Sequence, residues 1–371
     1  MHTHTDFYLP DVIPIELTRN YRSNDTNSYA FGIGTKFDQF GMYLWSAAQF
    51  QEVDLVLPDG AKIHYIRTSP GTGFSDAIFE HKVTSTSSVT PTIYNGSKIT
   101  WLSPGWVLKL RDGTTYRFGE NAPLQWIEDR YGNRLTIQRA VTNSYGNGVG
   151  NITGVTSPNG RSINFTYDAS NRVISAQDNL GRTVTYAYTA GRLSQVTNPE
   201  GGISSYAYDS AGRMTSYASP RSIVEFVNVY DINNRVSRQT LPDGGVFTFN
   251  YTLDINGKIT RTEVTDPRGF VRRIDFNTSG YIVSNTFALG RSEQQITTFV
   301  RDAGTNDILS ATDPLGRTTT YAYDAVGNLL STTRLAGTAN AVTTRYTYEP
   351  TYSQITSITD PLNHTTTLGY D

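Results

Sequence analysis

An all-β fold of antiparallel β-hairpin repeats is predicted by three features of this 371-residue sequence. One short pattern recurs from residue 156 to the end, and each copy contains stretches of alternating side-chain type. Turns that contain Gly or Pro separate these stretches. A repeat of this length indicates an architecture in which each copy packs against its neighbours. We expect the hairpins to join into a curved or spiral hollow sheet, with an irregular β cap at the N-terminus.

Two independent sets of positions measure the period. The first marks a turn, and its successive members are 20 to 26 residues apart. The second marks the end of a strand; it is Tyr in eight of ten copies, and its members are 20 to 25 residues apart. Their agreement makes chance a poor explanation. The turn positions are Gly160, Gly181, Gly201, Arg221, Gly244, Gly269, Gly290, Gly316, Gly337 and Asn363, and the strand-end positions are Tyr167, Tyr188, Tyr208, Tyr230, Tyr251, Phe276, Val300, Tyr323, Tyr348 and Tyr370.

One repeat illustrates the predicted hairpin. In residues 183–188, Val184, Tyr186 and Tyr188 alternate with smaller side chains, which is the period of a half-buried strand. A loop that contains Gly191 follows, and residues 193–197 return as a second strand. The turn at 198–201 then leads into the next copy.

The turn residues have structural roles in this interpretation. Pro cannot donate a hydrogen bond within a sheet, and the five repeat prolines all fall at predicted turns. These are Pro199, Pro220, Pro267, Pro314 and Pro361. The Asp that follows the strand-end Tyr is expected to accept hydrogen bonds from nearby backbone N–H groups. The Tyr is expected to pack its ring and keep its hydroxyl in water.

The number of strands sets the expected curvature. Ten repeats of two strands, about 4.8 Å apart, give about 95 Å of sheet, which is about 30 Å across if it closes in one turn. Open sheets of more than about 10 strands curl, and 16 or more strands leave a lumen. Such a lumen is too small for a folded domain of about 100 residues, whose radius of gyration is about 13 Å. The sequence therefore predicts a hollow wall, and a container would need either more repeats or a cargo that is not compactly folded.

The first part of the chain is β-rich but less regular. Strands or hairpins are predicted at 6–10, 15–21, 53–65 and 106–118. We interpret 1–110 as an N-terminal β cap domain, because a bare terminal repeat would expose a sheet edge. Residues 111–371 form the repeats, with the last one incomplete.

The clearest copy, Asp-Pro-Leu-Gly-Arg-Thr-Thr-Thr-Tyr-Ala-Tyr-Asp-Ala-Val-Gly-Asn-Leu at 313–329, resembles the consensus of the YD-repeat (Rhs) family. Residues 9–21 are similar to the start of the N-terminal conserved domain of bacterial Rhs proteins. Phe31-Gly32-Ile33-Gly34 resembles a Gly-x-Gly stretch of that domain, although Thr35 stands where the family has Trp. The resemblance covers nearly the whole chain.

This resemblance implies a function. Family members build a hollow shell of spiralling β-hairpins, and in bacteria the shell encloses a C-terminal toxin for delivery to other cells. Many members cleave themselves with aspartates in a core that follows the last repeats. Because the sequence stops at Asp371 within a repeat, we expect a chain truncated before that core, and no catalytic residue can be carried over.

The predicted function is therefore a non-enzymatic structural shell of a polymorphic toxin used in interbacterial competition. Its expected partners are the toxin domain and a secretion or delivery machinery. The protein is expected to be secreted or delivered by a secretion system, with no signal peptide visible. An alternative is a cell-surface or secreted carbohydrate-binding, adhesive protein in which rows of Tyr stack on sugars, although a structural Tyr ladder is favoured. A self-cleaving protease is the weakest hypothesis.

No catalytic, cofactor or metal site is predicted. His2 and His4 could bind a metal, but a disordered terminus is favoured, and His64, His81 and His364 are scattered in the sequence. Three Gly-x-Gly stretches, at 32–34, 71–73 and 146–148, lack the third Gly of a dinucleotide site. The pair Glu128-Asp129 is interpreted as a surface turn. A net charge of −2 argues against nucleic-acid binding, and no apolar run is long enough to span a membrane.

Overall fold

The computed structural model describes residues 2–81 and 92–370. All the helices and strands assigned in these ranges are β-strands, with no helix among them. The chain divides into two compact units. The first holds the residues up to 81 together with 97–235, and the second holds 92–96 together with 236–370. The predicted all-β class with antiparallel hairpin repeats is confirmed.

The first unit contains the irregular N-terminal strands and the first repeats. Its strands are β1 (His2–Leu9), β2 (Ile15–Tyr21), β3 (Ser28–Tyr29), β4 (Gly32–Ile33), β5 (Thr35–Phe37), β6 (Tyr43–Trp45), β7 (Glu52–Val56), β8 (Lys62–Arg67), β9 (Ile78–Glu80), β10 (Lys98–Trp101), β11 (Gly105–Lys109), β12 (Thr115–Gly119), β13 (Leu124–Glu128), β14 (Arg134–Thr142), β15 (Gly148–Thr156), β16 (Ser162–Tyr167), β17 (Val173–Asp178), β18 (Thr183–Thr189), β19 (Arg192–Thr197), β20 (Ile203–Tyr208), β21 (Met214–Ala218) and β22 (Val224–Tyr230).

The second unit contains only repeats among its strands. These are β23 (Val236–Thr240), β24 (Val246–Leu253), β25 (Ile259–Thr265), β26 (Val271–Phe276), β27 (Ile282–Phe287), β28 (Gln295–Arg301), β29 (Ile308–Thr312), β30 (Thr318–Tyr323), β31 (Leu329–Arg334), β32 (Val342–Tyr348), β33 (Ile355–Thr359) and β34 (Thr365–Thr367). Each pairs antiparallel with the next.

Two sheets make up most of the first unit. Strands β1, β2 and β5 form a three-stranded N-terminal sheet. From β6 to β22 each strand pairs antiparallel with the next in sequence. Pairing runs without a break through the β11–β12 hairpin, so the domain boundary at residue 110 stays a prediction.

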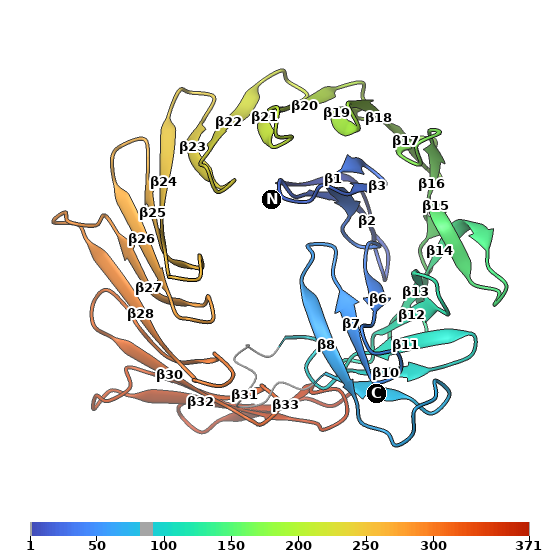
Figure 1. The fold of residues 1–371 in the computed structure, drawn as a ribbon. Helices are drawn as coiled ribbons and strands as arrows, with labels where there is room; N and C mark the ends of the chain where they lie inside the picture. The colour runs from blue at the N-terminus through green and yellow to red at the C-terminus, as the bar shows by residue number, and fades with distance from the viewer. Residues whose placement is uncertain (1, 82–91, 371) are drawn as a thin grey trace. The chain divides into compact units, whose positions relative to one another are not determined.

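The N-terminal sheet lies inside the curve of the first repeats. Within the first unit, strands β14 to β21 bend around β1 and β2 (Figure 1). Phe31 packs against Tyr186, and Phe37 packs against Phe165, with ring centroids 5.1 and 5.4 Å apart. Leu17 is fully buried in this core. The N-terminal segment therefore covers a face of the repeat sheet.

The predicted turn chemistry is present in the structure. One carboxylate oxygen of Asp168 accepts the N–H groups of Ser170 and Arg172, at 2.8 and 2.9 Å. The other oxygen pairs with the Arg172 guanidinium at 2.7 Å. Burial alone would raise the pKa of Asp168, but the N–H group and side chain of Arg172 outweigh this effect and lower it. The same Asp–Arg pair recurs at Asp178–Arg182, Asp209–Arg213, Asp231–Arg235 and Asp313–Arg317, and all five repeat prolines lie in turns.

The strand-end Tyr joins consecutive hairpins. The Tyr208 hydroxyl donates to the backbone carbonyl of Leu193, at 2.9 Å, on the return strand of the preceding hairpin. The expectation of a hydrated hydroxyl is thus wrong at these positions, because the ring is long enough to reach a carbonyl on the adjacent strand. All eight Tyr of the set do the same: Tyr167 to Ile152, Tyr188 to Val173, Tyr208 to Leu193, Tyr230 to Met214, Tyr251 to Val236, Tyr323 to Ile308, Tyr348 to Leu329 and Tyr370 to Ile355.

Arginine substitutes for Tyr in two copies. Val300 occupies the strand-end position of its repeat, and the next residue, Arg301, donates to the carbonyl of Ile282 at 2.8 Å. Earlier in the chain, Arg139 donates to the carbonyl of Leu124 at 3.3 and 3.1 Å. In these copies the link is made by a long side chain with a donor at its tip, whereas Phe276, at the strand-end position of its own copy, has no such donor.

We predict that Tyr208→Phe lowers the free energy of unfolding by about 1 kcal/mol, because it removes the hydrogen bond and leaves the Leu193 carbonyl without its partner. Urea unfolding, followed by Trp fluorescence, measures the change. Tyr145→Phe is the matched control, since Tyr145 is 48% exposed and its hydroxyl bonds no described residue. Equal unfolding curves for the two variants would contradict a stabilising link between hairpins through the Tyr208 hydroxyl.

Candidate interaction surface

The two faces of the repeat sheet differ in chemistry. We call the face that carries the strand-end Tyr the Tyr face and the opposite one the Thr face. On β18, Val184 and Tyr186 belong to the Tyr face and are 1% and 5% exposed. Thr185 and Ala187 point to the Thr face and are exposed. The pleat of the strand imposes this division, because successive side chains alternate between faces.

A buried ion pair fixes the N-terminal sheet to the Tyr face of the first unit. The Arg19 guanidinium donates twice to the Asp6 carboxylate, at 2.6 and 2.8 Å, and these side chains are 3% and 1% exposed. The Tyr186 hydroxyl also donates to Asp6, at 2.8 Å. Arg19 in turn donates to the Tyr206 hydroxyl at 3.2 Å. Two repeats thus contact a pair held by β1 and β2.

The electrostatics keep the Arg19 guanidinium charged. Burial alone would lower the pKa of Arg19, but the Asp6 carboxylate outweighs this effect and raises it well above its usual value. Burial and Asp6 together raise the pKa of Tyr186, which keeps its hydroxyl proton. The Arg19 guanidinium also lies 6.0 and 5.6 Å from the ring centres of Phe31 and Tyr206. A cation enclosed by rings and one carboxylate is well compensated.

Sequence reasoning missed this cluster. Asp6 and Tyr186 are 180 positions apart, so no spacing links them. A signal was present in β2, where Arg19 shares a strand face with Leu17 and Tyr21, both buried. A charged residue in an otherwise apolar row indicates a buried partner.

The N-terminal histidines are ordered, which corrects the expectation of a disordered terminus. His2 and His4 lie in β1, and the His2 ring packs 5.0 Å from the ring of Tyr217. Burial, followed by the charge of Arg19, lowers the pKa of His2 to about 4 and lowers that of His4. Among the described residues, no group of three or more His, Asp or Glu could hold a metal ion.

The other histidines lie apart from β1. His64 pairs with Asp54 at 2.8 Å, and the His81 ring contacts the backbone carbonyl of His64 at 2.8 Å. His364 pairs with Asp360 at 3.1 Å, in the second unit. The structure therefore brings His64 and His81 together, whereas His364 belongs to the second unit.

The remaining candidates are structural. A Cβ on Gly32 would lie 2.6 Å from the carbonyl oxygen of Gly191, so this Gly allows β4 to approach β19 closely. Glu128 pairs with Arg134 at 2.7 Å, and Asp129 accepts the N–H groups of Tyr131 and Asn133 in a turn.

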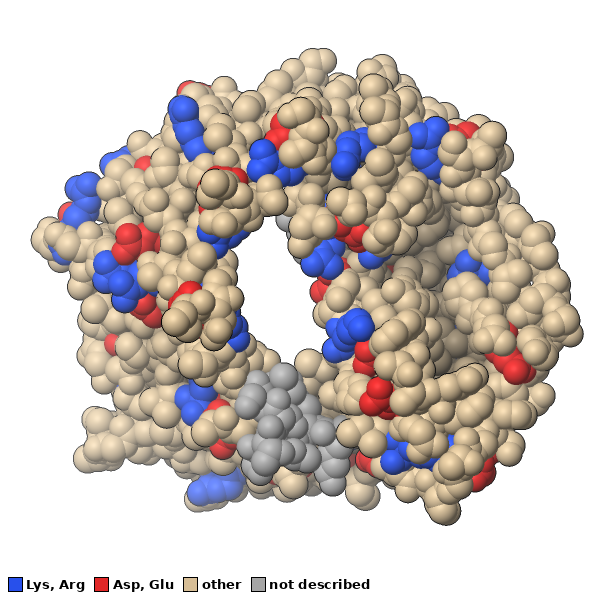
Figure 2. Space-filling model, in the orientation of Figure 1, with Lys and Arg blue, Asp and Glu red and all other residues tan. Residues whose placement is uncertain are grey.

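In the second unit, the Tyr face is half-exposed. Its aromatic and aliphatic members are Phe247, Phe249, Tyr251, Val264, Ile274, Phe276, Phe299, Tyr321, Tyr323, Tyr346, Tyr348 and Ile358, and none of them is buried. The Thr face carries the ion pairs Arg261–Asp275 and Arg273–Glu263, at 2.6 and 2.7 Å. Acidic and basic side chains often lie next to each other in the space-filling view (Figure 2). The second unit is therefore a two-faced sheet whose Tyr face is rich in aromatic side chains, also carries polar ones such as Arg272 and Asn285, and is left half-exposed by the unit's own described residues.

Comparison with known families agrees with this repeat structure. The family described as RHS Repeat matches residues 146–183, 167–203, 188–223 and 301–339. These stretches of the chain are therefore Rhs (YD) repeats. A second family, described as a domain of unknown function (DUF6531), matches residues 1–65. That match covers the N-terminal sheet and β7.

The solved structures that match this chain share low identity with it. The crystal structure of TcdB2-TccC3-Cdc42 has a TM-score of 0.48 and 15% identity, over 82% of this chain and 20% of that one. The Tc holotoxin pore of Photorhabdus luminescens has a TM-score of 0.41 and 12% identity, over 97% and 21%. The chain thus spans about a fifth of the length of these structures. No curated protein matches it, and no helix in the described ranges is suited to crossing a membrane.

Removing one partner of the buried pair should be costly. We predict that Arg19→Met lowers the free energy of unfolding of the first unit by about 3–5 kcal/mol, because it leaves the Asp6 carboxylate buried without its cation. The double variant Asp6→Asn/Arg19→Met should cost less than the sum of the single changes. Arg134→Met, which removes a half-exposed ion pair, should cost about 0–1 kcal/mol and serves as the control. Urea titration measures the free energy of unfolding of these three variants and of the single variant Asp6→Asn. Similar losses for Arg19→Met and Arg134→Met would refute the assignment of a buried ion pair.

The N-terminal strand should detach in mild acid. His2 and His4 are held neutral with lowered pKa values, so the unfolded state binds protons first as pH falls below about 6.5. Their contribution is fully present above that pH and is lost progressively as the pH approaches the folded value of about 4 for His2. Hydrogen exchange of β1 between pH 7 and 4 measures this loss. His2→Phe should reduce the pH dependence, whereas His364→Phe, at a site that is 76% exposed, should not.

Proposed function

We propose that this chain forms part of the wall of an Rhs toxin shell and that its Tyr face holds a toxin segment for delivery to other cells. The observation that carries the proposal is the half-exposed Tyr face of the second unit. An extended apolar surface on a folded protein marks an interaction site. The Rhs family resemblance supplies the cargo class, a toxin, and the route, a secretion or delivery machinery.

The first unit supports the proposal by showing what a Tyr face binds. There the face is covered by β1, β2 and β5, which present Phe37 and one fully paired charge, and by Phe31 in the turn before β4. The repeats of the second unit have the same alternation and the same Tyr joints but no such cover among the described residues of that unit. A cargo segment would occupy the corresponding position, with apolar side chains against the wall.

The role proposed for the wall is structural rather than catalytic. The recurrent carboxylates that could suggest acid–base chemistry are engaged in turns. Asp313, for example, accepts the N–H groups of Leu315 and Arg317 and pairs with the Arg317 side chain at 2.6 Å. Their lowered pKa values suit hydrogen-bond acceptors that stay ionised, and a general acid needs the opposite shift.

Glycan binding by the Tyr rows is less well supported. The strand-end Tyr hydroxyls donate their protons to backbone carbonyls, so these donors are not free for sugar hydroxyls. These Tyr side chains link consecutive hairpins through their hydroxyls. Carbohydrate adhesion therefore has no specific observation in its favour.

A site-specific crosslinking experiment tests the cargo surface. The photoreactive residue p-benzoylphenylalanine replaces Tyr321 on the Tyr face or Ala322 on the Thr face of β30. The purified full chain is irradiated with reduced, carboxymethylated lactalbumin, which stays unfolded, or with native lactalbumin. We expect crosslinks from position 321 to the unfolded probe to exceed those from position 322 several-fold, with little reaction with the native protein.

Positions 321 and 322 make the test decisive, because they are adjacent in the sequence but lie on opposite faces of the sheet. Equal crosslinking from both positions would overturn the proposal. So would a preference for native lactalbumin, because the proposed surface recognises apolar side chains that folding hides.

A further inference from the structure

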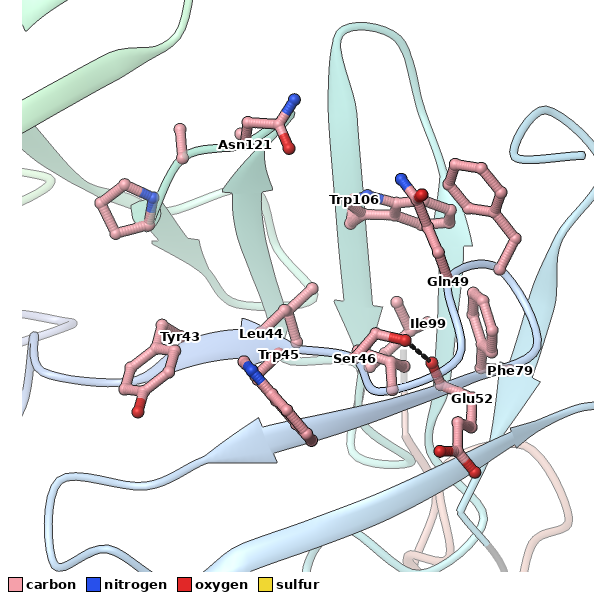
Figure 3. Close-up of a pocket in the computed structure, with 15 residues that line it drawn as sticks. Tyr43, Leu44, Trp45, Ser46, Gln49, Glu52, Phe79, Ile99, Trp106 and Asn121 are labelled. Atoms are coloured by element: carbon pink, nitrogen blue, oxygen red, sulfur yellow. Dashed lines mark hydrogen bonds between the residues drawn. The ribbon is translucent and has the colours of Figure 1, made fainter.

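A cleft of about 440 Å³ lies beside the short strand β6 in the first unit. Four consecutive residues, 43–46, line it along one side, so the cleft follows the whole strand. Trp106 of β11 and the loop at 121–123 line the other side (Figure 3). Its shape is therefore that of a groove parallel to a β-strand.

The deeper lining of the cleft is apolar. Ile99, Phe79 and Val53 are 0%, 3% and 8% exposed. The ring of Trp106 lies 5.6 Å from that of Phe79 and 6.3 Å from that of Phe50. This lining suits an aromatic or branched aliphatic side chain rather than a charged one.

Strand β6 is an edge strand. It pairs with β7 through Leu44 opposite Leu55, and within 2–81 and 92–370 no strand pairs with its other side. An unpaired edge presents a row of backbone N–H and C=O groups. In Figure 3 the cleft lies on the side of β6 where Leu44 points. The backbone of β6 and the apolar lining are thus available to one ligand.

Two free amides complete the rim. Gln49 and Asn121 are exposed, and neither side chain bonds another described residue. Tyr43 and Trp45 point away from Asn121 (Figure 3). The Trp45 ring is also occupied, with the Lys62 ammonium 4.5 Å from its centre. The exposed rings and the free amides therefore do not form one sugar-binding platform, and the edge favours a peptide.

We propose that this cleft binds an extended polypeptide segment that adds as a strand to the free edge of β6. The backbone of the ligand pairs with β6, one apolar side chain enters the cleft, and its neighbours in the sequence point to solvent. The partner is thus a segment of alternating polar and apolar residues with a central aromatic or aliphatic side chain. This site is separate from the Tyr face of the second unit, so the two proposals succeed or fail independently.

Synthetic heptapeptides provide the probe. They carry Thr-Val-Thr-X-Thr-Val-Thr, with X as Phe, Leu, Trp, Lys or Glu, a fluorophore at one end and the full chain as the receptor. Fluorescence anisotropy should show the Phe, Leu and Trp peptides binding about ten-fold or more tightly than the Lys and Glu peptides, which corresponds to about 1.4 kcal/mol. A panel in which no peptide binds below millimolar concentration would refute the proposal.

Backbone methylation separates strand addition from simple apolar binding. One version of the Phe peptide is N-methylated at odd positions and another at even positions. Because only alternate N–H groups of an added strand face its partner, one version should lose binding and the other should keep it. Loss of binding in neither version would contradict pairing with β6.

A matched pair of protein variants locates the site. Gln49→Trp places a large ring at the rim of the cleft, whereas Gln51→Trp adds the same ring at an exposed position that does not line it. We expect Gln49→Trp to weaken the Phe peptide about ten-fold and Gln51→Trp to leave it unchanged, with equal thermal unfolding of both variants. Equal weakening, or binding of oligosaccharides in place of peptides on the same protein, would overturn the assignment.

Discussion

The hydrogen bond from a strand-end Tyr to a backbone carbonyl of the preceding hairpin is the constraint on which the repeat sheet depends. Strand pairing alone leaves each hairpin free to shift along its neighbour, because backbone groups do not distinguish one register from another. The Tyr hydroxyl reaches a particular carbonyl, usually 15 residues earlier, as in Tyr208 to Leu193. Arg301 performs the same bond where the strand-end residue is Val300. A donor at the tip can therefore come from Tyr or Arg, although Phe276 keeps only the ring at its strand-end position.

This joint also determines the two-faced character of the sheet. Each strand-end Tyr must point to the side on which its carbonyl lies, so alternation places Tyr186 and Val184 on one face and small polar residues on the other. The result is an aromatic face repeated through both units. In the first unit the N-terminal sheet buries it, and the Asp6–Arg19 pair fixes that cover in a single orientation. In the second unit the Tyr face carries similar aromatic side chains, but no sheet formed by that unit's own described residues covers them. That face is therefore suited to contact with another polypeptide.

Local patterns predicted the strands and turns because they depend on neighbours in the sequence. Val184 and Tyr186 revealed the buried face, and the Asp of the Tyr-Asp pair accepts backbone N–H groups in the way that short-range geometry requires. Contacts between distant segments were not predictable in this way. Nothing local to His2 indicates that Tyr217 will pack against it, so the terminus was expected to be disordered. The bond from the Tyr208 hydroxyl to the Leu193 carbonyl is equally hidden from local patterns, because its acceptor belongs to another hairpin.

The two proposed binding surfaces use different chemistry, which bears on what each can select. The Tyr face offers side chains only, because its backbone groups are already paired within the sheet, as in the ladder of β30 with β31. A face of this kind selects for apolar content and is tolerant of sequence. The edge of β6 offers backbone groups beside a cleft of limited volume, so it requires an extended conformation and a side chain of suitable size. A wall that holds a variable cargo benefits from the first kind of surface, whereas attachment of one particular segment requires the second.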